Sequence, residues 1–208
     1  MAAEKCISGF ELAGGYCQKN FTHAEGANDF KVPTDLGRLQ IEVFGAAGGS
    51  GGLDCGLGCT VALSSDVGHL VLTFADLSGK TLKIYPGGKG GDGATGVTKS
   101  GGGLGGVSTF SDNLNGGRGG DTGPNGTSGA GGGGGAATVI EINGKQYIAA
   151  GAGAGGGSAN SRNGSTFGNT QAFWVDTTAG GNGVSSTCAV FCDGGGGGGG
   201  GAGVRGGA

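Results

Sequence analysis

The chain has 208 residues, of which 59 are glycine, about four times the ordinary share of this residue. Charged residues are 13 % of the chain and the net charge is −3, which excludes the basic surface that nucleic acid binding requires. Only three residues are proline, so the composition is not that of collagen, and no run approaches the about 20 apolar residues of a membrane-spanning helix.

The first part of the chain is expected to form a separate head. Cys6 and Cys17 bracket the segment CISGFELAGGYC, which also carries two aromatic residues. This spacing predicts a disulfide-closed loop or hairpin whose aromatic side chains need burial. The sequence therefore predicts an N-terminal head or attachment segment, 1–29, and a glycine-rich domain, 30–208. The start, MAAEK, lacks the apolar region of a secretory signal peptide.

Period-two patterns then predict short strands. Residues 39–44 alternate apolar and polar positions, and so do 70–74 and 81–85, with a turn at Gly79 between the last two. Asn143-Gly144 within TVIEINGKQYIAAG predicts a type I′ hairpin, because both central residues of that turn need positive φ. We expect almost no α-helix, since glycine in a helix interior costs about 1 kcal/mol per residue.

Long glycine runs separate these strands, mainly within 87–137, at 151–157 and near the C-terminus. Such runs are flexible linkers in many proteins, but here patterned strands bound them and serine and charge are sparse within them. The alternative is the polyglycine II helix, which is left-handed with three residues per turn. The predicted fold is therefore mainly β, with short antiparallel strands and hairpins around a packed bundle of polyglycine II helices.

Three blocks of the sequence resemble glycine-rich domains. These blocks are FKVPTDLGRLQIEVFGAAGGSGG, GKTLKIYPGGKGGDG and GAGGGGGAATVIEINGKQYIAAGAGAGGGS, and together they cover roughly residues 30–157. Such domains occur in phage tail-fibre and bacterial surface adhesins and in the extracellular region of anaplastic lymphoma kinase-type receptors. The resemblance implies a rigid scaffold of polyglycine II helices whose connecting loops bind a receptor.

The cysteines suggest disulfides and an oxidising environment, because their number is even and they fall into three local pairs. Two pairs have the spacing C-x3-C and could instead form a four-thiolate zinc site or pair with each other. Zinc knuckles prefer C-x2-C, so we expect disulfides and no metal. The six residues are Cys6, Cys17, Cys55, Cys59, Cys188 and Cys192.

Two aspartates lie in similar glycine contexts. Asp92 in GGKGGDGAT and Asp121 in GGRGGDTGP fit the first half of a calcium-binding repeat. The copies are not in tandem, and the position that should be a large aliphatic residue is Ala94 in one and Gly123 in the other. We therefore expect each aspartate to cap a glycine turn.

Aromatic residues among small polar ones mark the candidate recognition site. The insertion 158–186 combines such residues, which is the chemistry of binding loops, although Phe173 and Trp174 could instead form a local core over the ends of the glycine helices. A second candidate is the loop near residue 110. The predicted receptor-binding residues are Arg162, Phe167, Phe173, Trp174, Phe110 and Asn113.

No catalytic constellation stands out. Neither His23 nor His69 has a nucleophile at a recognisable spacing, and no cofactor motif is present. We expect a non-enzymatic recognition protein of a virion or cell surface, of the phage tail-fibre adhesin type, that binds a host-surface glycan or outer-membrane protein. The alternatives are a structural subunit of a virion or extracellular filament, for which a homo-oligomer is one option, and a receptor-ectodomain-like ligand-binding module.

Overall fold

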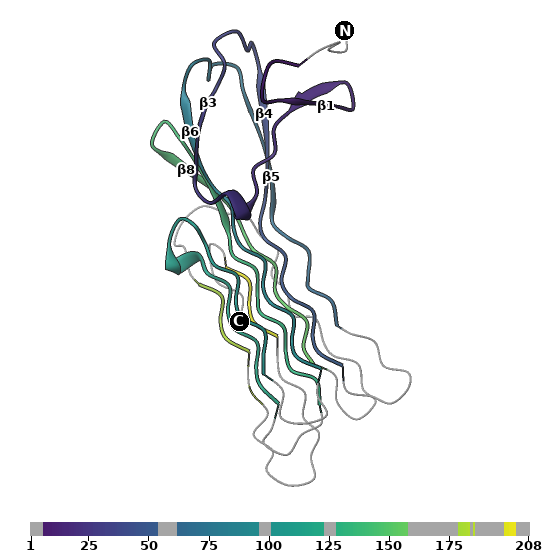
Figure 1. The fold of residues 1–208 in the computed structure, drawn as a ribbon. Helices are drawn as coiled ribbons and strands as arrows, with labels where there is room; N and C mark the ends of the chain where they lie inside the picture. Colours follow the sequence, from purple (N-terminus) through teal and green to yellow (C-terminus); the bar gives the residue numbers. More distant parts are fainter. Residues whose placement is uncertain are drawn as a thin grey trace.

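The computed structural model describes residues 6–53, 62–95, 101–122, 128–157, 179–183, 185 and 198–202. This part of the chain is mainly β, with short antiparallel strands and two 3-10 helices of three residues each. Figure 1 shows the strands gathered at one end of an elongated molecule and glycine-rich segments running from them to the opposite end. The predictions of a β-rich fold and of almost no α-helix are confirmed for these residues.

Two sheets pack against each other at the strand-rich end. The larger sheet has the order β3-β6-β7-β8, and β4 and β5 form a two-stranded sheet that contacts β7 and β8. All neighbouring strands are antiparallel. The strands are β3 (Asn28–Lys31), β4 (Leu39–Phe44), β5 (His69–Phe74), β6 (Thr81–Tyr85), β7 (Thr138–Ile142) and β8 (Lys145–Ala149).

The apolar core lies between these two sheets, as the period-two patterns predict. In β4 and β5 every second residue faces the larger sheet, and the register pairs Ile41 with Leu72 and Val43 with Leu70. The predicted inward residues of β6, Leu82 and Ile84, are buried. The buried members of this core are Val32, Val43, Leu77, Leu82, Ile84, Ile140, Ile142 and Ala149.

The predicted hairpin joins β7 to β8. Asn143 has φ 51° and Gly144 has φ 75°, which is the pair of positive values that a type I′ turn requires. The turn sets the register that places Val139 opposite Ile148. The hairpin and its turn type are thus confirmed.

The head is a small disulfide-closed hairpin beside the sheets. Its strands β1 (Glu11–Ala13) and β2 (Tyr16–Gln18) pair with each other, and Cys6 and Cys17 form the predicted disulfide. Edge-to-face packing holds it to the body, with the ring of Phe30 lying 5.9 Å from Phe10 and 5.5 Å from Phe21. The larger sheet begins with β3 at Asn28, two residues before the expected domain boundary at residue 30.

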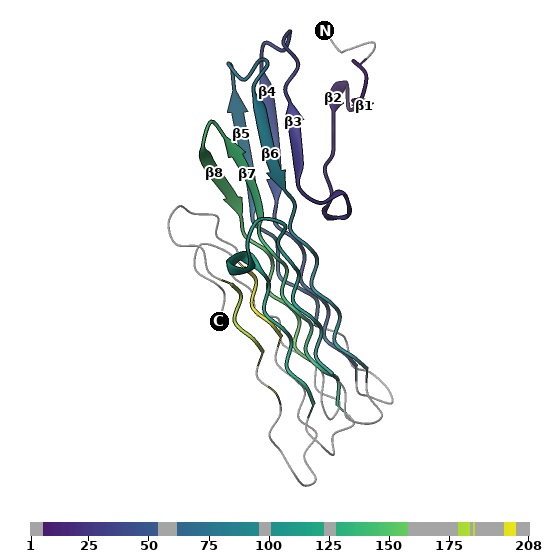
Figure 2. The same cartoon turned by 60° about the vertical axis from the view of Figure 1, so that its left-hand side comes forward.

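Glycine-rich segments fill the other end of the molecule, and we call them together the glycine array. Figures 1 and 2 show them running side by side away from the strands. Five of them lie next to a strand in the sequence. The segments are 45–52, 62–68, 87–94, 101–106, 116–122, 129–137, 150–157, 179–183 and 198–202.

Hydrogen bonds join these segments with a repeat of three residues. Within 129–137, successive N–H groups donate to three neighbouring segments in turn, so every third N–H donates to the same segment. The three accepting segments are 88–94, 114–120 and 152–155. Carbonyl groups of the same segment accept bonds from three others, 45–52, 101–106 and 198–202. Six segments therefore surround 129–137, which satisfies its buried backbone groups without a β-sheet.

The array is too tightly packed for side chains at its interior positions. A Cβ atom built on Gly132 would lie 2.5 Å from the carbonyl oxygen of Gly49 and 2.7 Å from that of Ser50. Real Cβ atoms do not approach other atoms within 3.0 Å. Only glycine fits where backbone approaches backbone this closely.

Candidate recognition surfaces

The ends of several array segments meet at the end of the molecule farthest from the sheets, which we call the distal end (Figure 1). Hydrogen bonds connect them: Gly52 donates to Ala130 at 2.8 Å, Ala130 to Ala94 at 3.0 Å, and Ala94 to Gly101 at 3.2 Å. Gly51 likewise donates to Ala62 at 3.0 Å. The connections that leave the array at residues 53, 95 and 122 and return at 62, 101 and 128 therefore all start and finish at this end.

Small polar side chains lie at the distal end. The Thr95 hydroxyl accepts a hydrogen bond from the N–H of Leu53 at 3.3 Å. Thr122 and Ser128 are buried beside the connection between them, and the Ser128 hydroxyl has no hydrogen-bond partner among the described residues. Leu63 is 64 % exposed at the start of the segment that returns there. The distal end thus combines a hydrogen-bonded backbone with small polar side chains and an exposed apolar side chain.

Most of the predicted recognition residues lie outside the described residues. These are Arg162, Phe167, Phe173 and Trp174 in the insertion. The predicted disulfide cysteines Cys55, Cys59, Cys188 and Cys192 lie outside the described residues as well. Before the insertion, Gly157 lies at the distal end near Gly129. Near its end, Gly180 donates a hydrogen bond to Asn115 at 2.9 Å, close to the sheets. The roles of the insertion and of these cysteines stay predictions.

The second predicted site, Phe110 and Asn113, lies at the sheet side of the array and not at the distal end. The 3-10 helix η2 (Asp112–Leu114) carries Asn113, which is exposed. Phe110 is half-buried, with its ring packed edge-on against Tyr85 at 4.9 Å. Burial raises the pKa of the Tyr85 hydroxyl, and the nearby Glu141 carboxylate, which accepts its hydrogen bond at 3.3 Å, adds to this effect. Phe110 therefore anchors the loop that displays Asn113.

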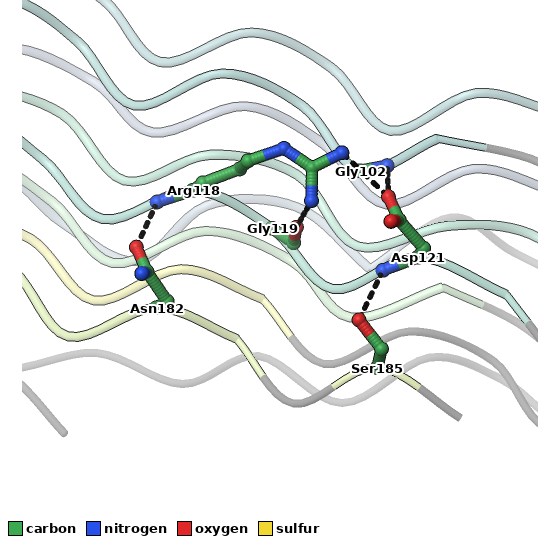
Figure 3. Close-up of polar contacts among 6 residues, drawn as sticks. All are labelled: Gly102, Arg118, Gly119, Asp121, Asn182 and Ser185. Atoms are coloured by element: carbon green, nitrogen blue, oxygen red, sulfur yellow. Dashed lines mark hydrogen bonds and ion pairs between the residues drawn. The ribbon is translucent and has the colours of Figure 1, made fainter. Parts of the chain in front are cut away.

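A polar network joins three segments on one side of the array (Figure 3). The Asp121 carboxylate accepts hydrogen bonds from the Arg118 guanidinium at 2.6 Å and from the N–H of Gly102 at 2.8 Å. In turn the N–H of Arg118 donates to the Asn182 side chain at 2.9 Å, and the N–H of Asp121 donates to the Ser185 hydroxyl at 3.0 Å. These side chains satisfy N–H groups at the edge of the array and fix its outermost segment.

Asp92 plays the same part on the other side. Its carboxylate accepts a hydrogen bond from the N–H of Ser50 at 2.8 Å and lies 3.8 Å from the Lys89 ammonium. Asp92 and Asp121 were expected to cap local glycine turns, and in the structure both also accept hydrogen bonds from N–H groups of neighbouring segments. The described residues contain no group of three or more His, Cys, Asp or Glu side chains that could hold a metal ion.

Two exposed features were not anticipated from the sequence. On the outer face of β4 and β5, the Phe44 and His69 rings stack at 4.2 Å, and the His69 imidazole lies 3.6 Å from the Glu42 carboxylate. On the outer side of the array, Leu104 and Val107 are exposed three residues apart. Two sequence features could have indicated them. Phe44 is an aromatic residue at a position of its strand where polar residues alternate with the core residues, and Leu104 and Val107 are aliphatic residues within a glycine run.

The chain matches no protein-family model, no curated protein and no solved structure. Its resemblance to glycine-rich domains rests on the sequence blocks quoted above and stays a prediction. In the described residues, no helix has the length and apolar character needed to cross a membrane.

Proposed function

We propose that this chain is a non-catalytic recognition protein of a virion or cell surface, in which a rigid glycine array presents connecting loops to a host-surface receptor. The observation that carries the proposal is the convergence of the array connections at the distal end. Loops that leave a rigid scaffold at one end can combine into a single binding surface, as they do in other loop-based recognition proteins. No cofactor is needed for this activity.

The array segments are polyglycine II helices in this proposal. A helix of this type has three residues per turn, so every third N–H points in the same direction. The three-residue hydrogen-bond repeat of 129–137 and its six neighbours support this assignment. The close approach of Gly132 to Gly49 supports it as well, because such packing has no room for a Cβ atom.

The rigidity of this scaffold favours binding. A loop that is ordered before it meets its receptor loses less conformational entropy on association. Hydrogen bonds among Gly52, Ala94, Gly101 and Ala130 fix the positions from which the distal connections start. The aromatic residues of the insertion, above all Trp174, would then supply the binding energy, with Phe173, Phe167 and Arg162 beside it.

The disulfide of the head fits an extracellular location. Cys6 and Cys17 are bonded, and disulfides persist mainly in oxidising environments. A virion or cell-surface component works in such an environment. The head would then attach the chain to the rest of the virion or surface structure.

The test is the binding of fluorescently labelled protein to a panel of bacterial cells. We expect selective binding to some surfaces, and Trp174→Ala should weaken it at least about thirtyfold, the loss typical of a binding hot spot. Phe44→Ala is the matched control, because Phe44 is an exposed aromatic residue of the sheets, at the end of β4 and away from the distal end. Absence of binding to every surface, or equal loss in both variants, would contradict the proposal and favour a structural subunit.

A further inference from the structure

Asparagine followed directly by glycine is a pair of residues at which the chain can lose ammonia. Asparagine is among the residues that limit the chemical lifetime of proteins, and a following glycine has no Cβ atom to hinder attack on the asparagine side chain. The described residues contain three such pairs, Asn115-Gly116, Asn143-Gly144 and Asn182-Gly183. The structure places these three pairs in very different surroundings.

The reaction needs both residues of the pair to be free. The backbone nitrogen of the glycine attacks the side-chain carbon Cγ of the asparagine and forms a C–N bond, and the side-chain nitrogen leaves as ammonia with the proton of the glycine N–H. Water then opens the resulting succinimide ring at one of its two carbonyl groups, which gives aspartate or isoaspartate. A hydrogen bond on the glycine N–H or on the asparagine side chain therefore has to break before the ring can close.

The first pair is held closed by hydrogen bonds. The side-chain oxygen of Asn115 accepts a bond from the N–H of Ser108 at 2.7 Å, and its side-chain nitrogen donates to the Asp112 carboxylate at 3.3 Å. The N–H of Gly116 donates to the Gly106 carbonyl at 2.8 Å. Both reacting groups of this pair are thus occupied.

The pair Asn182-Gly183 is closed in the same way. The side-chain oxygen of Asn182 accepts a bond from the N–H of Arg118 at 2.9 Å (Figure 3), and the N–H of Gly183 donates to the Arg118 carbonyl at 2.8 Å. Both bonds join the outer segment 179–183 to 116–122. Ring closure at Asn182 therefore requires these two segments of the array to separate.

The pair Asn143-Gly144 lies open at the tip of the β7–β8 hairpin. Both residues are exposed, and a Cβ atom built on Gly144 would meet no atom within 4 Å. Neither the Asn143 side chain nor the Gly144 N–H has a hydrogen-bond partner in the part of the chain that the structure describes. The turn follows the last strand pair, Ile142 with Lys145, so its backbone can rotate without separating β7 from β8.

We propose that Asn143 is a site of spontaneous deamidation and that it reacts faster than Asn115 and Asn182. Each hydrogen bond that must break lowers the population of the reactive form about fivefold. At least two bonds hold each of the other pairs, so Asn143 reacts at least about tenfold faster than either of them.

Isoaspartate at this position alters the hairpin, because it inserts one additional atom into the backbone of the turn. The type I′ turn has two residues, and its geometry sets the register that places Val139 opposite Ile148. A turn of a different length does not support this register. Since β8 is an edge strand of the larger sheet, the product loosens β8 while the pairing of β3, β6 and β7 persists.

Peptide mapping by mass spectrometry of protein stored in mildly alkaline buffer tests the proposal. The map follows each pair separately, including Asn125-Gly126 and Asn163-Gly164, which lie outside the described residues. We expect the deamidated fraction to grow at least about tenfold faster at Asn143 than at Asn115 and Asn182. Unfolding the chain in urea removes the protecting bonds, so the three rates should then converge.

Three outcomes would overturn the proposal. The first is an equal rate at the three pairs in the folded protein, and the second is an Asn143 that stays intact in the folded protein but reacts in urea. The third is a preference for Asn143 that persists unchanged in urea, since the local sequence and not the fold would then determine the rate.

Two variants test the effect on the hairpin. Asn143→Gly retains a sequence that suits the type I′ turn and should form no isoaspartate at this position. Asn143→Asp is the matched control for charge, because it carries the carboxylate on an ordinary backbone. Hydrogen exchange of the β8 amides should be faster in the purified isoaspartate form than in Asn143→Asp, and equal exchange would refute the loosening of β8.

Discussion

Replacing Gly132 by alanine tests whether glycine is required by backbone packing inside the array. The new Cβ would lie 2.5 Å from the Gly49 carbonyl oxygen, 0.9 Å short of the 3.4 Å at which ordinary contact begins. The obstructing atoms belong to the backbone of segment 45–52, so no side chain can rotate out of the way. Segments 45–52 and 129–137 must therefore separate.

The cost follows from the bonds between these two segments. An opening of about 0.9 Å stretches the bond from the Gly49 N–H to the Gly133 carbonyl, now 2.8 Å, beyond hydrogen-bonding length. Leaving a buried backbone group without a partner costs about 1–3 kcal/mol, and overpacking a rigid interior costs about another 1–3 kcal/mol. We expect a loss of about 2–6 kcal/mol, which for a chain of this size lowers the melting temperature by roughly 4–24 °C.

Gly101→Ala is the matched control within the same array. A Cβ atom at Gly101 would meet only the Asp121 carboxylate, at 3.9 Å, so the substitution should be neutral or stabilise by about 0.4–1 kcal/mol through the unfolded state. Differential scanning calorimetry of the two variants and the wild type gives the comparison. If Gly132→Ala melts within about 2 °C of Gly101→Ala, the packing argument fails.

Three further predictions follow from other parts of the fold. The double variant Cys6→Ser with Cys17→Ser should expose the head to limited proteolysis while the melting temperature of the body stays within about 2 °C, as mass spectrometry and calorimetry would show. Because the pKa of Tyr85 is raised above 10.0, its contribution to stability is present below pH 10 and is lost as the pH rises through the folded-state pKa; urea denaturation should therefore show a steeper loss above about pH 10 in the wild type than in Tyr85→Phe. Gly144→Ala should cost only about 1–2 kcal/mol in the same assay, because the site has φ 75° but no atom within 4 Å.

Local signals in the sequence predicted the strands and the hairpin. The alternation of 39–44 and the Asn143-Gly144 pair act over a few residues, and the structure has both where they were expected. Pairing between distant elements was not predictable in this way. β3 pairs with β6 across about 50 residues, and this pairing begins at Asn28, inside the segment assigned to the head.

The surfaces were harder to predict than the fold, because a glycine run has no apolar or polar face. Its few other residues carry the information, and their spacing of three residues shows which positions lie on the same side. Lys89 with Asp92 and Arg118 with Asp121 follow this spacing, but in the sequence it was interpreted as a calcium repeat or a turn cap. The insertion 158–186 was chosen for its aromatic residues, and its role stays a prediction.

Glycine alone cannot determine how such an array is aligned, because sliding a pure glycine segment by three residues recreates the same hydrogen bonds. Strands fix the alignment of the segments that extend from them, such as 45–52 after β4 and 129–137 before β7.

The C-terminal segment 198–202 extends from no described strand, so it needs another marker of register. Ala202 provides one: it is fully buried against Leu114 and Ala137, its N–H donates a hydrogen bond to the Gly135 carbonyl, and its carbonyl accepts one from the Gly151 N–H. A slip by one repeat in either direction would place glycine in this apolar pocket or force the Ala202 methyl group against backbone. The rare non-glycine residues thus define the register of the array, and its glycines allow the close packing that makes the register matter.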